Sequence, residues 1–338
     1  MPARLPWPLV FQVLGVLAAV GLVVSTWEIW LLLFTALVLA AAIRPAARLG
    51  ERYAVPRGVT VLLVYLGTAA LLSLMGALLW PALSEQSREL IDRLPAMIEN
   101  VKGWMGDLTT YMASWGSWLP APKADNLQGA LSGILANTVR VTTGVFGAVV
   151  GLLVVLVIAA YLVVDEGRIG RTLLMLVPVR HRALTASLAE PVLDRVGGYV
   201  RGQLVSSMFV GALIAIALSL LGVRYALLVG ALAAVLNIVP FLGATIAAVL
   251  GILSALNDSL LKAVLAAVIM GVAQLVEGKL LAPHFVGRAT GLHPLAVLLA
   301  LLAGAHLAGL IGALVAIPLL AGVWEIVRRL CLEPAPPA

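Results

Sequence analysis

Asn237-Ile-Val-Pro240-Phe-Leu-Gly243 lies in the middle of a run of 33 residues, from Tyr225 to Asn257, that contains no Asp, Glu, Lys or Arg. A helix needs roughly 20 apolar residues to cross a hydrocarbon layer, so this run is long enough to cross and to contain a break. Proline removes one backbone hydrogen bond and clashes with the preceding turn, and lipid cannot solvate the carbonyls that are freed. The sequence predicts two half-helices or a re-entrant hairpin here, with a simple proline kink as the alternative.

The rest of the chain has the same character. Hydrophobic residues make up 62% of 338 residues and charged residues 11%, and the mean hydropathy is +1.09. Soluble domains have about 25% charged residues, so a water-soluble globule is excluded. Further runs without charge are Leu5–Trp27, Gly58–Ser84, Val141–Val164, Gly202–Val223, Ala263–Val276 (which needs Gly278–Phe285 to reach across) and Ala289–Trp324, and Ile29–Ile43 is a shorter one.

These runs predict an all-α integral membrane protein of about eight transmembrane helices with an interrupted sixth segment. The expected parts are helices 1–3 in residues 1–80, an amphipathic extramembrane segment in 81–140, helix 4 in 141–164, a cytoplasmic helical linker in 165–202, and helices 5–8 in 203–330. The first run could also be a signal peptide, because Arg4 precedes it, but its length and the apolar segment that follows favour a hairpin anchor.

Two segments between spans have helical periodicity and many charges. In 81–140, apolar residues recur at steps of three, four and seven, which is typical of an amphipathic helix that lies on the membrane, contacts other copies or covers the transmembrane core. In 165–201 a similar pattern is interrupted by Pro178 and Pro191 and predicts two or three short cytoplasmic helices.

The cations predict the orientation, because short loops rich in Lys and Arg stay in the cytoplasm. Eight crossings would put Arg44, Arg168, Arg195 and Arg328 on one side, with both termini in the cytoplasm. The cations Arg224, Lys279 and Arg288 fall on the other side and do not fit. The net charge of +6 reflects this topology and contact with anionic membrane lipid, and it does not indicate nucleic-acid binding.

Polar residues around the predicted break are candidates for a substrate pathway. Transporters place half-helix ends near the bilayer midplane, where freed backbone groups meet the solute. Asn237 precedes Pro240 by three residues, and Gly243 and Thr245 follow it. We expect these four residues to line the pathway.

A second candidate is the end of the seventh run, where Gln274 and Glu277 share a helix face. An ionisable residue at the end of an apolar run is a candidate functional site, and a carboxylate that binds a proton or Na⁺ could couple transport. The alternative is that Glu277 pairs with Lys279 or Arg288 and holds the helix end at the lipid interface. His306, in the last run, is more typical of a hydrogen bond between helices than of a ligand.

Several other activities have no sequence signature. There is no HExxH, GxSxG or paired Asp motif, so we do not expect an enzyme, and the histidines match no metal motif. The single cysteine, Cys331, allows neither an intramolecular disulfide nor a cysteine metal site. No cofactor is expected. A scaffold that only packs in the membrane remains an alternative to a transporter.

The motifs resemble the autoinducer-2 exporter family of bacterial membrane proteins, in order along nearly the whole chain. They are Tyr199-Val-Arg-Gly202-Gln203-Leu, the Asn237–Gly243 stretch, Glu277 with Pro283, Gly287 and Gly291-Leu-His293-Pro294, and Gly309-Leu-Ile-Gly312-Ala-Leu-Val-Ala-Ile-Pro318. The last two segments are the specific ones.

The resemblance implies a multi-pass transporter of the bacterial cytoplasmic membrane, forming a homo-oligomer. Members of this family are associated with efflux of autoinducer-2 or with Na⁺/H⁺ antiport. A pocket for a small polar polyol would offer Asn237, Thr245 and Gln274 as hydrogen-bond partners, whereas an antiporter would depend on Glu277.

Overall fold

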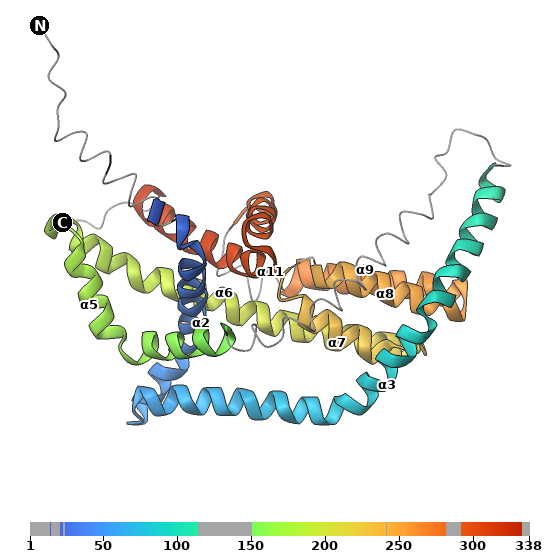
Figure 1. Cartoon of the computed structure of the whole chain (residues 1–338), viewed down its shortest axis with the longest axis horizontal. Helices are drawn as coiled ribbons and strands as arrows, with labels where there is room; N and C mark the ends of the chain where they lie inside the picture. Colours follow the sequence, from blue (N-terminus) through green and yellow to red (C-terminus); the bar gives the residue numbers. More distant parts are fainter. Residues whose placement is uncertain are drawn as a thin grey trace, which may run out of the picture.

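The computed structural model describes residues 14, 21–22, 24–113, 151–240, 242–281 and 292–332, and these residues form helices and short turns with no strand (Figure 1). In chain order the helices are α2 (Trp27–Arg52), α3 (Arg57–Ala113), an unlabelled helix Gly151–Val164, α5 (Glu166–Leu176), α6 (Val179–Leu220), α7 (Ala226–Leu236), α8 (Leu242–Asp258), α9 (Leu260–Val276), α11 (Pro294–Val327) and the π-helix η2 (Arg328–Leu332).

Five of these helices are long and apolar enough to cross a membrane: Trp27–Arg52, Arg57–Gln86, Val179–Leu220, Leu260–Leu281 and Leu295–Cys331. Three shorter apolar helices add to them, Gly151–Val164, Ala226–Leu236 and Gly243–Asp258. Only 6% of the most apolar stretch of Arg57–Gln86 is buried within the protein, so its side chains are suited to contact with lipid. The chain is therefore an all-helical, multi-pass membrane protein. Most of the predicted first span, Leu5–Trp27, lies outside the described residues.

The helix α3 is one continuous helix of 57 residues. At 1.5 Å per residue it is about 85 Å long, far more than the roughly 30 Å of a hydrocarbon core. It passes through Pro81 and Pro95 without ending, and its ribbon turns away in its second half (Figure 1). The apolar third span and the start of the amphipathic stretch thus belong to the same helix.

The expected interruption of the 165–201 segment at Pro178 is present, but the one at Pro191 is not. The helix α5 ends at Leu176, and α6 then runs for 42 residues through Pro191 to Leu220. A single proline removes only one hydrogen bond, and the long apolar part of α6 packs on other helices, so the helix continues. The linker therefore contains one short helix, and its remainder is the beginning of α6.

A core of small and branched residues holds α6, α7, α8 and α9 together, including the fully buried Leu218, Val229, Ala247 and Ala266. Glycines allow α6 and α7 to touch: a Cβ on Gly211 would lie 2.6 Å from the carbonyl oxygen of Gly230. In lipid there is no hydrophobic driving force between helices, so helices associate there by close packing through small residues.

The α7–α8 pair is a hairpin that enters and leaves at one end of the molecule. Lys262 joins the residues just before α7 to the end of α8. Its Nζ donates to the carbonyl of Gly222 (3.1 Å) and to Oδ2 of Asp258 (2.9 Å). On the same end, Oε1 of Gln86 on α3 accepts from the backbone N–H of Leu228 (3.0 Å). The sixth segment is therefore a helical hairpin within this bundle.

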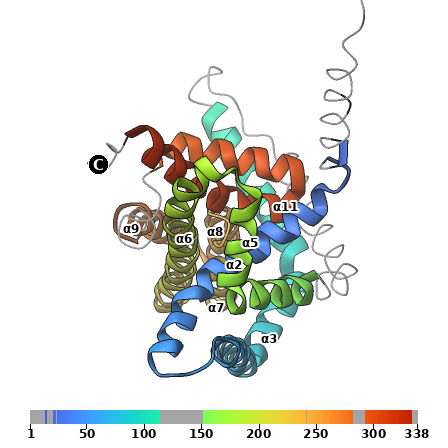
Figure 2. The same cartoon turned by 90° about the vertical axis from the view of Figure 1, so that its left-hand side faces the viewer.

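The predicted last span, Ala289–Trp324, is not one straight helix. Within α11 the backbone leaves helical geometry at Ala308 and Gly309, and Gly309 has φ of +59°, which favours glycine. The bend brings Gly304 against Gly312, where a side chain on either would overlap the other's backbone. The two limbs point in different directions in Figures 1 and 2.

The helix α2 crosses α6 at a proline. Pro45 has no N–H to donate to the carbonyl of Ala41, and Nη1 of Arg201 on α6 donates to the carbonyls of Ala41 (3.3 Å) and Ala42 (3.2 Å) instead. Gly197 has no side chain at the point where α6 passes Ala41. The arginine thus replaces a bond that the proline removes.

Candidate functional site

The break between α7 and α8 has a local cause at each side. The helix α7 ends at Leu236 with Asn237 at its C-cap, and Pro240 cannot donate a hydrogen bond back to Leu236. The chain then reverses, and a Cβ at Gly243 would overlap the backbone of Asn237, so only glycine fits this turn. At 11 residues, α7 reaches about 17 Å from its start, roughly half the hydrocarbon thickness.

Asn237 is fully buried at the tip of this hairpin and connects three helices. Its backbone carbonyl accepts from Nε2 of Gln203 on α6 (2.8 Å), and its Nδ2 donates to Oε1 of Glu277 at the end of α9 (2.7 Å). Gln203 is also buried, with Ser207 Oγ 3.4 Å from its Nε2. We refer to Gln203, Asn237 and Glu277 as the polar chain.

One atom of the polar chain has no partner. The side-chain oxygen Oδ1 of Asn237 is buried and accepts no hydrogen bond from the protein atoms described. Leaving a buried acceptor unpaired costs about 1–3 kcal/mol, so such atoms require an explanation.

Glu277 is half-buried, at the point where α9 widens into a π-helical turn over residues 277–281. Such turns are frequent at functional sites. Among the described residues its partner is Asn237, and no ion pair joins it to Lys279; Arg288, the other expected partner, lies outside them. The carboxylate therefore faces the helix break.

Thr245 and Gln274 lie elsewhere. Both are exposed and line an open hollow of about 450 Å³ between α8 and α9, together with Ala244, Ala248, Val249, Ile252 and Leu253. The structure thus brings Asn237, Pro240, Gly243 and Glu277 together and places Thr245 and Gln274 on the adjoining outer face.

The motif residues near the C-terminus have structural roles where they are described. Nδ1 of His293 accepts from the N–H of Leu295 (3.2 Å), which caps α11, and Pro294 is the first residue of that helix. Gly309 is the residue at which α11 bends, and Gly312 lies in close contact with Gly304 across the bend. Pro318 is fully buried. Pro283, Gly287 and Gly291 lie outside the described residues. His306 is exposed beside the bend.

Two residues that matter here were not among the predicted site residues. Gln203 was visible as a polar residue in a charge-free run, beside Ser206 and Ser207, but nothing in the sequence placed it against Asn237. Arg201 was visible only as a cation at the end of the 165–201 segment, and its contact with α2 depends on Pro45, which is 156 positions away.

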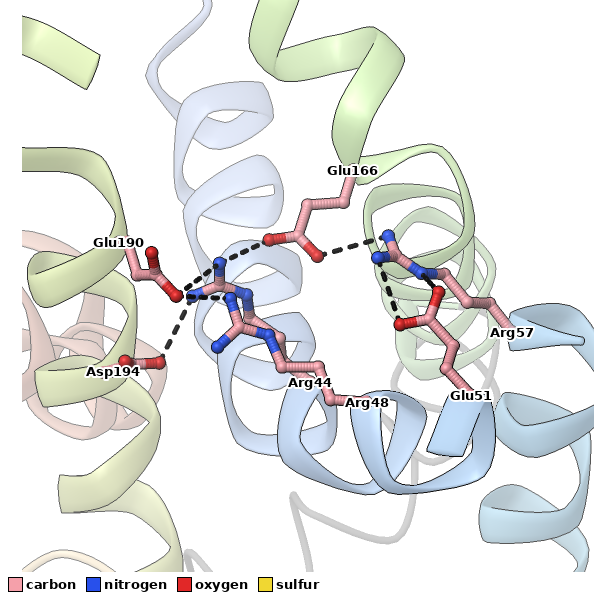
Figure 3. Close-up of polar contacts among 7 residues, drawn as sticks. All are labelled: Arg44, Arg48, Glu51, Arg57, Glu166, Glu190 and Asp194. Carbon is pink, nitrogen blue, oxygen red and sulfur yellow. Dashed lines mark hydrogen bonds and ion pairs between the residues drawn. The ribbon is translucent and has the colours of Figure 1, made fainter. Parts of the chain in front are cut away.

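Three cations of the loop after the second predicted span form a network with carboxylates, most of them in the 165–201 segment (Figure 3). Arg44, which is buried, reaches Glu166 (2.6 Å), Asp194 (3.2 Å) and Glu190 (3.9 Å). The network continues through Arg48–Glu190 (2.6 Å), Arg57–Glu51 (2.5 Å) and Arg57–Glu166 (3.3 Å). It joins α2, α3, α5 and α6, and we call this part of the molecule the arginine-rich end.

A helix break with a buried polar chain, inside a bundle of lipid-suited helices, defines a membrane protein of the transporter class. The comparisons with known proteins agree with this class. The family described as AI-2E family transporter matches residues 9–331, and the chain belongs to that family.

Three relatives illustrate the similarity. "Putative transport protein YueF" of Bacillus subtilis (strain 168) is 27% identical over 290 residues, which cover 82% of this chain and 78% of the relative. "Putative transport protein YrrI" of the same organism is 29% identical over 277 residues, covering 78% and 75%. "Putative transport protein YhhT" of Escherichia coli (strain K12) is 26% identical over 187 residues, covering 55% and 53%.

Proposed function

We propose that this protein exports a small polar solute of the autoinducer-2 type across the bacterial cytoplasmic membrane, through a pathway that passes the tip of the α7–α8 hairpin. The observation that carries the proposal is the polar chain, in which the buried Asn237 joins α6 to Glu277 and keeps an unpaired Oδ1. A solute with hydroxyl groups can donate to this oxygen, and the adjoining, mainly apolar hollow presents two polar side chains, Thr245 and Gln274.

The second candidate function is Na⁺/H⁺ antiport. The carboxylate of Glu277 and the amide oxygen of Asn237 are hard oxygen ligands of the kind that a small cation prefers, and the carboxylate can also carry a proton. Here Glu277 would be the coupling residue. In the polyol exporter it would only orient Asn237.

The proposal includes a topology. Because the α7–α8 hairpin returns to the end where it entered, α9 leads Lys279 back toward the arginine-rich end. That end also holds the C-terminal part of α11, since Glu325 pairs with Arg195 of α6. Placing it in the cytoplasm keeps the C-terminus inside and puts Lys279 on the side that the rule for positive loops favours. The N-terminus is assigned to the same side, and the oligomer is assigned as homomeric.

Flux in sealed vesicles made with purified protein tests the function. We expect Glu277→Gln to abolish Na⁺/H⁺ exchange if the protein is an antiporter, because the amide cannot titrate. If it exports a neutral polyol, we expect efflux to fall by about tenfold or less, since the loss of one charge-assisted hydrogen bond corresponds to about 1.5 kcal/mol.

The matched control is Glu28→Gln, the same chemical change at an exposed position in the first turn of α2. It should leave flux unchanged. A wild-type protein that moves neither polyols nor monovalent cations would contradict both transport functions and support a membrane scaffold.

A further inference from the structure

The tip of the α7–α8 hairpin is held from outside by a side chain of α6. Nε2 of Gln203 donates to the backbone carbonyl of Asn237 at 2.8 Å, and Oγ of Ser207, one turn further along α6, lies 3.4 Å from the same nitrogen. Gln203 is 6% exposed and Asn237 is fully buried, so bulk water does not compete for this bond. The contact is made at the residue whose Oδ1 is the proposed acceptor for the solute.

The carbonyl that Gln203 binds belongs to the end of a helix. In an uninterrupted α-helix, the carbonyl of Asn237 would accept from the N–H four residues later. The helix α7 ends at Leu236 and does not supply that N–H. A carbonyl that is buried at a helix end without a partner is destabilising. Gln203 therefore takes the place of the bond that a continuing helix would have made.

The helix α6 is a stiff support for this contact, because it is fixed on both sides of Gln203. Toward the arginine-rich end, Asp194 of α6 accepts from Arg44 of α2 at 3.2 Å. In the other direction Gly211 lies against Gly230 of α7, where a Cβ would be 2.6 Å from the carbonyl oxygen. Figure 1 shows α6 running from the arginine-rich end to α7. Contacts carried by anchored helices hold a site more accurately than contacts carried by loops.

Three contacts together fix the side-chain oxygen of Asn237. Gln203 holds the backbone carbonyl, Glu277 accepts from Nδ2 at 2.7 Å, and Gly243 lies against the backbone, where no side chain fits. The side-chain amide is planar, so Oδ1 is placed once the backbone and Nδ2 are held. Gln203 does not bond Oδ1 itself, and it acts on this acceptor only through the backbone of Asn237.

We propose that Gln203 is the positioning residue of the solute site: by holding the carbonyl of Asn237, it sets where Oδ1 meets the solute and so determines the affinity. This inference rests on the proposed transport through the hairpin tip. A hydroxyl that donates to Oδ1 needs a donor–acceptor distance of about 2.7–2.8 Å and a nearly straight bond. A tip that is displaced by about 1 Å does not offer this geometry, so α6 contributes to recognition without touching the solute.

The test compares two glutamines that bind the same hairpin. Gln86 of α3 accepts from the N–H of Leu228, near the start of α7, at 3.0 Å. Gln203→Met and its matched control Gln86→Met each remove one such bond, and both should lower Tm of the full chain in detergent by a few degrees. In vesicles, Gln203→Met should also raise KM for the transported probe, ribitol or Na⁺, about tenfold with kcat nearly unchanged, because it weakens binding of the solute. Gln86→Met should leave KM unchanged.

Two negative results have different meanings. Equal KM values in the wild type and in Gln203→Met would show that this residue only stabilises the hairpin, and they would overturn the inference while the proposed function stands. A wild-type protein that moves neither ribitol nor Na⁺ would overturn the proposed function and the inference together.

Gln203→Glu provides a second measurement if the methionine variant does not fold. A neutral carboxylic acid can donate its O–H to the carbonyl of Asn237, whereas a carboxylate can only accept. The ratio of KM in this variant to KM in the wild type should therefore fall toward one as the pH is lowered. Taking the ratio removes the effect of Glu277, which titrates in both proteins. A ratio that does not fall as the pH is lowered would overturn the inference.

Discussion

The arginine-rich end and the hairpin tip both bury polar groups, but they satisfy them differently. Arg44 has three carboxylates within 4 Å, so its charge is compensated within the protein. At the tip, Asn237 has one side-chain partner and an oxygen with none. The first arrangement fixes four helices, and the second leaves an acceptor for something that is not part of the chain. Arg44 also has one buried nitrogen, Nε, without a partner among the described residues, so the two sites differ in charge compensation by three carboxylates at the arginine-rich end and in an open acceptor at the tip.

The largest expected effect is at the arginine-rich end. Arg44→Ala removes the common partner of Glu166, Asp194 and Glu190, and breaking a buried ion pair from one side costs about 3–5 kcal/mol. We expect the free energy of unfolding to fall by that amount in chemical denaturation in detergent. Arg52→Ala, an exposed arginine of the same helix, is the control and should change it by less than about 0.5 kcal/mol. Similar losses in both variants would contradict a structural role of the network.

The next effect is at the hairpin tip and concerns its shape. Gly243→Ala places a methyl group on the backbone of Asn237 and should cost about 1–3 kcal/mol, because overpacking forces the turn to shift. Solute flux should fall with it, since the shift displaces Oδ1 of Asn237. The free energy of unfolding and the flux in vesicles are the two measurements.

Gly271→Ala is the matched control for this substitution. A Cβ at Gly271, inside α9, meets nothing within 4 Å, so alanine there should be neutral or stabilising by up to about 1 kcal/mol. A stable and fully active Gly243→Ala variant would show that the tight turn at the hairpin tip is not required.

The sequence predicted the break correctly, because Pro240 acts locally and the run around it is too long for one span. It also singled out Asn237 and Glu277 as candidates, since polar residues in charge-free runs are rare; their role in transport stays a prediction. It did not predict that Glu277 would lie beside Asn237, because that contact depends on how α9 packs against the hairpin. Gln203 was missed for the same reason.

Predictions of helix ends from proline alone were wrong where tertiary packing determines the course of the helix. Pro191 was expected to end a helix, yet α6 continues through it, and the bend in α11 occurs at Gly309, nine residues before Pro318. Glycine at a positive φ and close glycine contacts determine this bend, and such contacts depend on the positions of both limbs.

The smallest expected effect is at the base of the hairpin, where the ion pair is partly exposed and not buried as at Arg44. The side chains of Lys262 and Asp258 are 34% and 32% exposed, and exposed pairs contribute about 0.2–1 kcal/mol. Lys262→Met keeps the apolar stem and removes the bonds to Asp258 and to the carbonyl of Gly222, so we expect a loss of about that size. It should also speed hydrogen exchange at the start of α7 and the end of α8 while leaving the tip unchanged.

Lys279→Met, which removes an exposed lysine near the tip, is the control. Faster exchange at the tip after Lys262→Met would mean that the base and the polar chain open together, and the two kinds of site would then not be independent.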